Sequence, residues 1–188
     1  MSEVEVFHPK TTKEWRDWLE KNHQLSESVW VVFHSKASKK PSISWSDSVT
    51  EALCFGWIDS KKIKIDTDTS HQFFSKRKAK STWSKINKDK IERLIEQGLM
   101  HPAGLKCIEI AKQNGSWTIL DEVEELILPK DLQKEFQAYE GAEEFYHSLS
   151  KSKKKMILYL LVSAKKQETR ETRIKKIAEA AAEKKSIV

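Results

Sequence analysis

Aromatic and polar side chains that could bind a small anion gather around one predicted β-hairpin. The string Phe55-Gly56-Trp57-Ile58-Asp59 is followed about twenty residues later by a second aromatic and polar group. An indole offers a flat apolar face and one N–H donor, and arginine and lysine donate charged hydrogen bonds to anions. We therefore predict a pocket for a small anionic or planar ligand, with the indoles as walls and Arg77 and Lys78 as anion contacts. Its candidate residues are Trp45, Trp57, Asp59, Arg77, Lys78, Ser81, Trp83, Ser84 and Asn87.

The same residues also allow a structural interpretation. Trp57 and Trp83 would then be core residues at a sheet–helix junction, and Ser84 or Asn87 would cap a helix. Asp59 and Arg77 would form a structural ion pair. A third interpretation is an enzyme that acts on a small anionic metabolite at this pocket, with Asp59 as general base. The sequence leaves these alternatives open.

No pattern typical of catalysis, a metal or a nucleotide cofactor stands out. The six histidines are scattered, and none forms His-x-x-x-His or pairs with a cysteine at zinc spacing. Ser81 and Ser84 lack Gly-x-Ser-x-Gly surroundings, and the chain has neither a Walker loop nor a Gly-x-Gly-x-x-Gly string. His34 and His71 could be cross-strand neighbours, but further ligands are lacking. We therefore assign no catalytic residue and expect neither a cofactor nor a metal.

Residues 151–188 carry the excess positive charge of a chain whose net charge is +6. Lys166, Arg170 and Arg173 share one face of a predicted helix, because a helix repeats about every 3.6 residues. Such a basic face favours contacts with the phosphates of nucleic acid or with an acidic protein. The alternative is a solvated helix face, with Arg170 docking the helix onto the rest of the fold. No nucleic-acid-binding module stands out, so a small ligand or a protein is the preferred partner, and the oligomeric state stays open.

Local patterns predict the elements that position these residues. Thr11 and Glu14 form a capping box for a helix over 12–22. Ser44 or Ser46 begins a helix that ends near Gly56. β-branched and aromatic residues predict strands, the last two as a hairpin, at 28–36, 58–66 and 71–76, with 4–7 as an added edge.

The second half of the chain shows only helical patterns. The run Met156–Val162 is apolar all round and predicts a central buried helix over 153–164. We predict an α+β fold: a small antiparallel sheet of three or four strands packed with helices over 1–90, then an all-helical part over 91–188. No linker rich in Gly, Ser or Pro separates the two parts, so we expect one continuous body.

The chain also shows the features of a cytoplasmic protein. No basic region followed by an apolar run opens it, so we expect no signal peptide. The longest apolar run has seven residues, whereas a membrane span needs about twenty. Cys54 and Cys107 form no Cys-x-x-Cys, and we interpret them as reduced thiols of an intracellular protein.

Distinctive strings over almost the whole length carry a family resemblance. They include Pro41-Ser-Ile-Ser-Trp45, Glu51-Ala-Leu-Cys-Phe-Gly-Trp-Ile-Asp59, Trp83-Ser-Lys-Ile-Asn87, Gly98-Leu-Met100 and Glu168-Thr-Arg170. In these strings the chain resembles the YdeI/OmpD-associated, or bacteriocin-protection, family of small bacterial proteins. Ser75 departs from the family's pattern, which often carries Thr-Pro at this strand end.

The resemblance implies a role in protection against cationic antimicrobial peptides or bacteriocins and in envelope stress. It supplies neither a molecular mechanism nor catalytic residues. The net charge of +6 makes direct capture of cationic peptides electrostatically unfavourable. We therefore expect a non-enzymatic binding protein that protects indirectly, through an unidentified small ligand or partner.

Overall fold

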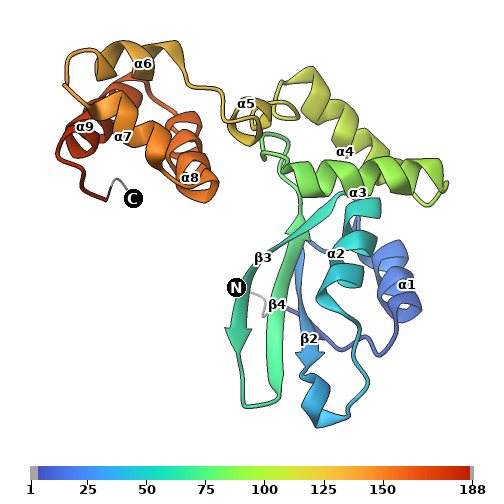
Figure 1. Ribbon diagram of the computed structural model, residues 1–188. Helices are drawn as coiled ribbons and strands as arrows, with labels where there is room; N and C mark the ends of the chain where they lie inside the picture. Colours follow the sequence, from blue (N-terminus) through green and yellow to red (C-terminus); the bar gives the residue numbers. More distant parts are fainter. Residues whose placement is uncertain (1–3, 187–188) are drawn as a thin grey trace. The chain divides into compact units, whose positions relative to one another are not determined.

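The computed structural model describes residues 4–186, which form two compact units (Figure 1). The first extends to Trp117 and the second begins at Thr118. The first unit holds a sheet with helices and the second is all helical, so the predicted α+β fold class is confirmed. The expected division at residue 90 and the packing of both parts into one body stay predictions.

The sheet of the first unit has the strand order β1-β2-β4-β3. Its strands are β1 (Val6–Phe7), β2 (Ser28–His34), β3 (Trp57–Lys64) and β4 (Thr69–Lys76). The β3–β4 hairpin is antiparallel, and β2 pairs antiparallel with β4. Strand β1 instead pairs parallel with β2, because a helix crosses over between them. The expectation of a purely antiparallel sheet is therefore corrected to a mixed one.

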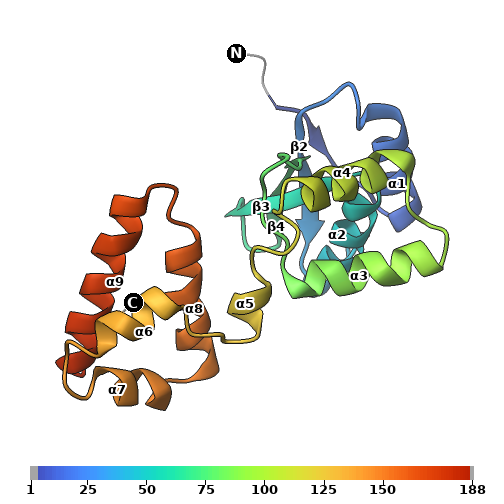
Figure 2. The same ribbon diagram turned by 90° about the horizontal axis from the view of Figure 1, so that it is seen from above.

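Two helices cover one face of this sheet, as Figures 1 and 2 show. Helix α1 (Thr12–Asn22) begins as predicted, since the Thr11 hydroxyl accepts from the backbone N–H of Glu14. Helix α2 (Trp45–Cys54) is capped by Ser44. The short helix η1 (Lys36–Ser38) lies in the connection between β2 and α2.

Helices α3 (Lys85–Glu96) and α4 (Pro102–Gln113) complete the first unit. Helix α4 approaches the end of α2 so closely that a Cβ on Gly104 would lie 2.1 Å from the carbonyl oxygen of Cys54. Only glycine fits this crossing. The core of the unit includes Trp15, Trp57 and Trp83, each 1 % exposed or less.

The second unit consists of helices packed around their own core (Figure 2). They are α5 (Asp121–Glu124), α6 (Lys130–Phe136), α7 (Ala142–Ser148), α8 (Lys151–Val162) and α9 (Gln167–Ala182). The prediction that the 153–164 helix is buried all round was wrong. Met156 and Tyr159 are about half exposed, at 53 % and 50 %, because α8 buries only the stripe with Ile157, Leu158 and Leu161. Within residues 4–186, no helix combines the length and apolarity that a membrane span requires.

Candidate functional site

Two of the predicted site residues, Trp57 and Arg77, line a cavity of about 370 Å³ in the first unit. We call it the indole cavity. Four segments build it: the end of α1, the turn into β3, the end of β4 and the middle of α4. Its lining residues are His23, Gln24, Phe55, Gly56, Trp57, Lys76, Arg77, Ala79, Ala103, Lys106, Cys107 and Ile110.

Gly56 shapes the floor of this cavity. Its φ of +73° is a conformation that side chains rarely adopt, and it turns the chain from α2 into β3. A Cβ there would also lie 3.1 Å from the Cβ of Cys107 on α4. The glycine therefore brings the Trp57 backbone close to α4, as the sequence suggested for a residue at a helix end.

Arg77 is held by the backbone and by one aromatic ring. Its backbone N–H donates to the Gly56 carbonyl at 2.9 Å. Its guanidinium carbon lies 3.7 Å from the ring centre of Trp83, a close cation–π contact, and Nη1 donates to the Thr82 carbonyl. Burial lowers the pKa of Arg77 to about 10, partly offset by Cys107 and Asp59. The group therefore keeps its positive charge at neutral pH.

The anticipated ion pair between Asp59 and Arg77 does not form. In the β3–β4 register Asp59 lies opposite Phe74, so Arg77 has already left the strand pair. A single oxygen of Asp59, Oδ2, accepts hydrogen bonds from Trp45 Nε1 at 2.9 Å and from Gln72 Nε2 at 3.1 Å. Asp59 therefore holds Trp45 and Gln72, and Arg77 forms no ion pair with a carboxylate of the described residues.

Unpaired buried nitrogens concentrate at the indole cavity. In the described part of the chain, four buried side-chain polar atoms lack a hydrogen-bond partner. Three belong to residues of this cavity: His23 Nε2, Trp57 Nε1 and Arg77 Nε. An unsatisfied buried polar group costs about 1–3 kcal/mol, so three such atoms in the lining residues of one cavity call for an explanation.

The remaining predicted residues lie elsewhere. Trp83 is 1 % exposed, and the guanidinium of Arg77 packs on its ring. Of the two capping candidates Ser84 and Asn87, Ser84 caps α3, since its hydroxyl accepts from the backbone N–H of Asn87. Lys78 is exposed and Ser81 half-buried, and neither lines the indole cavity. The ligand-binding roles given to these residues stay predictions.

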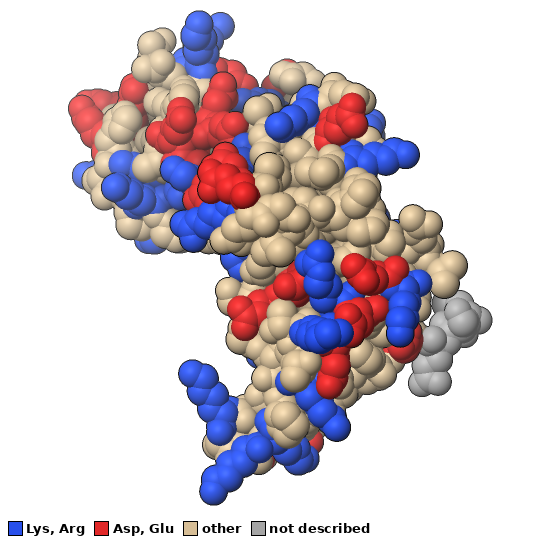
Figure 3. All heavy atoms as spheres, turned by 90° about the vertical axis from the view of Figure 1, so that its right-hand side faces the viewer, with Lys and Arg blue, Asp and Glu red and all other residues tan. Residues whose placement is uncertain are grey.

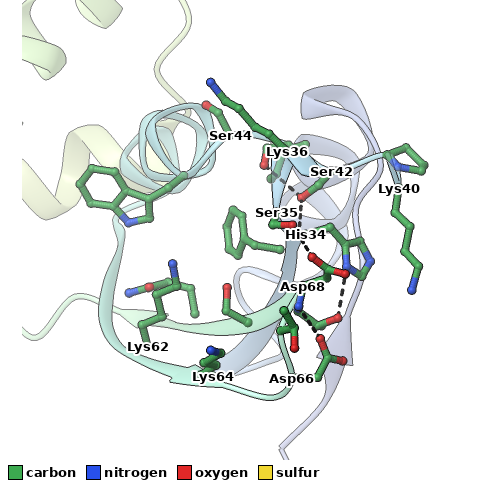
Figure 4. Close-up of a pocket in the computed structure, with 18 of the residues that line it drawn as sticks. His34, Ser35, Lys36, Lys40, Ser42, Ser44, Lys62, Lys64, Asp66 and Asp68 are labelled. Carbon is green, nitrogen blue, oxygen red and sulfur yellow. Dashed lines mark hydrogen bonds between the residues drawn. The ribbon is translucent and has the colours of Figure 1, made fainter. Parts of the chain in front are cut away.

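A second and larger cavity, of about 990 Å³, lies at the opposite end of β3 and β4 and takes in Trp45 (Figure 4). We call it the lysine cavity, because Lys36, Lys39, Lys40, Lys62 and Lys64 line it. Sequence analysis missed these five residues. The spacings Lys36-x-x-Lys39-Lys40 and Lys62-x-Lys64 were the available signal, but the two groups meet only through the pairing of β2 and β3 with β4.

The thiol of Cys107 reaches the indole cavity, whereas Cys54 is buried; neither forms a disulfide. Burial raises the pKa of Cys107, partly offset by the positive charge of Arg77. Among residues 4–186 there is no group of three or more His, Cys, Asp or Glu side chains that could hold a metal ion.

The predicted basic face of the second unit is partly used in internal contacts. Arg170 donates from Nε and Nη2 to both carboxylate oxygens of Asp131, at 2.6 and 2.9 Å. Arg173 donates to the Leu160 carbonyl and to the Ser163 hydroxyl. Lys166 is exposed at the start of α9. An anion-binding role for this face stays a prediction, whereas the docking role of Arg170 has a visible partner.

Comparison with known families gives two matches that follow the two units. Residues 7–107 match the family described as Domain of unknown function (DUF8412), and residues 125–184 match "Bacteriocin-protection, YdeI or OmpD-Associated". Comparisons with curated proteins and with solved structures gave no match. The strings around Trp57 and Trp83 thus lie in the first matched domain and those around Arg170 in the second. The chain therefore belongs to the DUF8412 family, whose model covers more than half of its length, and its C-terminal residues 125–184 form a domain that matches the bacteriocin-protection, YdeI or OmpD-associated family.

Proposed function

We propose that the N-terminal unit binds a small organic carboxylate in the indole cavity, and that the protein protects bacteria against bacteriocins or cationic peptides through this binding. One observation carries the proposal: three buried nitrogens without partners belong to residues that line one cavity. The family match to the second unit supports the protective role.

The chemistry of the lining favours a carboxylate over a cation or a neutral ligand. Trp57 Nε1 and Arg77 Nε can only donate, and the Arg77 guanidinium is charged. His23 Nδ1 lies 2.9 Å from the Leu19 carbonyl and must donate to it, so Nε2 of a neutral His23 is an acceptor. A carboxylate would take the two N–H groups, and a hydroxyl or amino group of the same ligand would donate to His23.

The walls favour an organic ligand over an inorganic ion. Phe55, Ala103 and Ile110 supply apolar surface, and Lys106 lies exposed at the rim. Small-molecule sites combine mostly apolar walls with a few placed polar groups. Since each unpaired nitrogen is covered in the structure, binding includes a side-chain adjustment that uncovers it.

The test is a titration of intrinsic tryptophan fluorescence with acetate, pyruvate, lactate, succinate, benzoate and inorganic phosphate. We expect saturable binding of at least one of the organic acids. The variant Arg77→Met should weaken this binding about 10-fold or more, because a hydrogen bond to a charged group contributes about 1.5–3 kcal/mol.

Arg93→Met is the matched control, since it removes the same charge from an exposed position on α3. It should bind like the wild type. Circular dichroism confirms that both variants are folded. The proposal fails if none of the acids binds, or if Arg77→Met and Arg93→Met bind with equal affinity.

A further inference from the structure

The lysine cavity combines a concentration of positive charge with an exposed indole. Lys36, Lys39 and Lys40 stand on the connection between β2 and α2, and Lys62 and Lys64 stand on β3. Figure 4 shows Lys62 and Lys64 on one wall and Ser42 and Ser44 on the other. In Figure 3, blue spheres predominate at the lower end of the molecule, where Figure 1 places the tip of the β3–β4 hairpin.

A bulge in β3 aims two of these lysines at the cavity. The pairing with β4 shifts between Asp59 and Lys62, after which Lys62 lies opposite Gln72 and Lys64 opposite Ser70. Directly opposed residues of an antiparallel pair share a face, so both lysines lie on the cavity face with Gln72. Lys61 turns to the other face, where its ammonium lies 5.1 Å from the ring centres of Trp30 and Phe73.

The positive charge at the cavity exceeds the negative charge, since five lysines and two aspartates line it. None of the five ammonium groups forms an ion pair or a donated hydrogen bond with any described residue. The two carboxylates of the cavity are used in the hairpin turn: Asp66 accepts from the N–H groups of Asp68 and Thr69, and Asp68 accepts from the Ser35 hydroxyl. An excess of three positive charges around one cavity fits a ligand that carries several separated negative charges.

The aromatic group at the cavity is fixed in position and open to solvent. Trp45 is 56 % exposed, while its Nε1 donates to the carboxylate of Asp59 at 2.9 Å. A large indole that is exposed but held in place by a hydrogen bond is a stacking platform with little ordering cost. An acidic peptide would contact the lysines but would not need the Trp45 ring. A nucleic acid would contact the lysines with its phosphates and could stack a base on the ring.

We propose that the lysine cavity binds single-stranded nucleic acid, with a base stacked on Trp45 and the phosphates along the two lysine walls. This site is separate from the indole cavity and does not depend on the carboxylate proposed there. Single-strand binders of this kind combine a positively charged groove with aromatic side chains and show little sequence preference.

The test uses the full chain and fluorescein-labelled ten-nucleotide oligo(dT) and oligo(U), with fluorescence anisotropy as the readout at several salt concentrations. The double variant Lys62→Gln/Lys64→Gln should weaken binding at least 10-fold. It should also lower the slope of log affinity against log salt by about 1.4, since each lost contact to a single strand contributes about 0.7.

The matched control is Lys61→Gln/Lys80→Gln, which removes the same charge from the opposite sheet face and from an exposed turn. It should behave like the wild type, which separates this cavity from other lysines of the first unit. Trp45→Ala should weaken binding about 10-fold, and Trp45→Phe should retain most of it, because base stacking contributes about 1–3 kcal/mol.

Four outcomes would overturn the proposal. They are the absence of binding at low salt, equal binding by the two double variants, full binding by folded Trp45→Ala, and equal competition by polyglutamate of the same charge. The last two would show a surface that attracts any polyanion without stacking.

Discussion

Two arginines, one in each unit, show how the same side chain can serve the fold or face a cavity. Arg170 in the second unit holds Asp131 with two hydrogen bonds between α9 and α6. Arg77 in the first unit is more deeply placed, yet it has no carboxylate and rests on the ring of Trp83. The first arginine is therefore paired with a carboxylate inside its unit, whereas the second is a buried charge without one, and we propose that a ligand supplies it.

The tryptophans allow the two units to be followed separately. All seven lie at or before Trp117 and thus in the first unit, while the three tyrosines lie after residue 118 in the second. Tryptophan fluorescence therefore reports unfolding of the first unit, and hydrogen exchange of the helix amides reports the second. The predictions below use these two signals.

The largest expected effect comes from removing the ring beneath Arg77. Trp83→Ala should lower the free energy of unfolding of the first unit by about 3–5 kcal/mol, since it empties a fully buried site and strips the guanidinium of its contact. Urea unfolding followed by tryptophan fluorescence measures the change. Trp45→Ala, at an exposed position, is the control and should cost under about 1 kcal/mol. If Trp83→Ala and Trp45→Ala lose equal free energy of unfolding, the Trp83 ring does not stabilise the first unit as described.

The paired arginine should show a smaller but clear effect. Arg170→Met leaves the Asp131 carboxylate without its two donors, and should destabilise the second unit by about 1 kcal/mol. The estimate is low because the Asp131 side chain is 41 % exposed. Exchange rates of the α6 and α9 amides measure it, with Lys175→Met as a control on the exposed face of α9. If these amides exchange at the same rate in Arg170→Met as in the wild type, the contact between Arg170 and Asp131 does not stabilise the second unit.

The same pair predicts how stability depends on pH. The hydrogen bonds from Arg170 lower the pKa of Asp131 from its ordinary value of 3.8. The stabilisation is therefore fully present above that value and is lost as the pH falls below it through the lowered pKa. Acid titration of the second unit should show this loss in the wild type and a weaker one in Arg170→Met. Identical curves would contradict the assignment.

The unpaired arginine should have the smallest effect on stability. Arg77→Met leaves no carboxylate unpaired, and the removal of a desolvated charge offsets part of what is lost with the contacts to Trp83 and the Thr82 carbonyl, so we expect a loss smaller than that of Arg170→Met. Urea unfolding by tryptophan fluorescence provides the value. If Arg77→Met loses more free energy of unfolding than Arg170→Met, Arg77 contributes more to stability than Arg170, and the comparison is wrong.

Local signals predicted most of the fold, because they depend on residues close in sequence. The Thr11 and Ser44 caps, the turn at Gly56 and the hairpin strands all follow from such patterns. The sequence did not reveal the crossover that makes β1 parallel, since strand direction depends on packing between distant segments.

The candidate site was predicted less completely, because cavities depend on register. The grouping of Trp57, Arg77 and Trp83 was anticipated, whereas His23 and Cys107 come from helices that no local pattern links to the hairpin. The bulge after Asp59 places Lys62 and Lys64 on the cavity face, and a single shift of this kind reverses which side chains point inward. Neither feature can be read from spacing alone.

The most direct test of the account is a proton–nitrogen NMR titration that follows the indole N–H signals and the Arg77 Nε–H signal. Trp57→Phe assigns the Trp57 signal, and Trp15, whose Nε1 donates to the Ser48 carbonyl at 3.0 Å, serves as the internal reference. We predict that the Trp57 and Arg77 signals begin at positions typical of unbonded N–H groups and move downfield together as a carboxylate such as lactate or benzoate saturates the protein, while Trp15 stays fixed. Signals that already lie at hydrogen-bonded positions and respond to none of the acids would contradict the account.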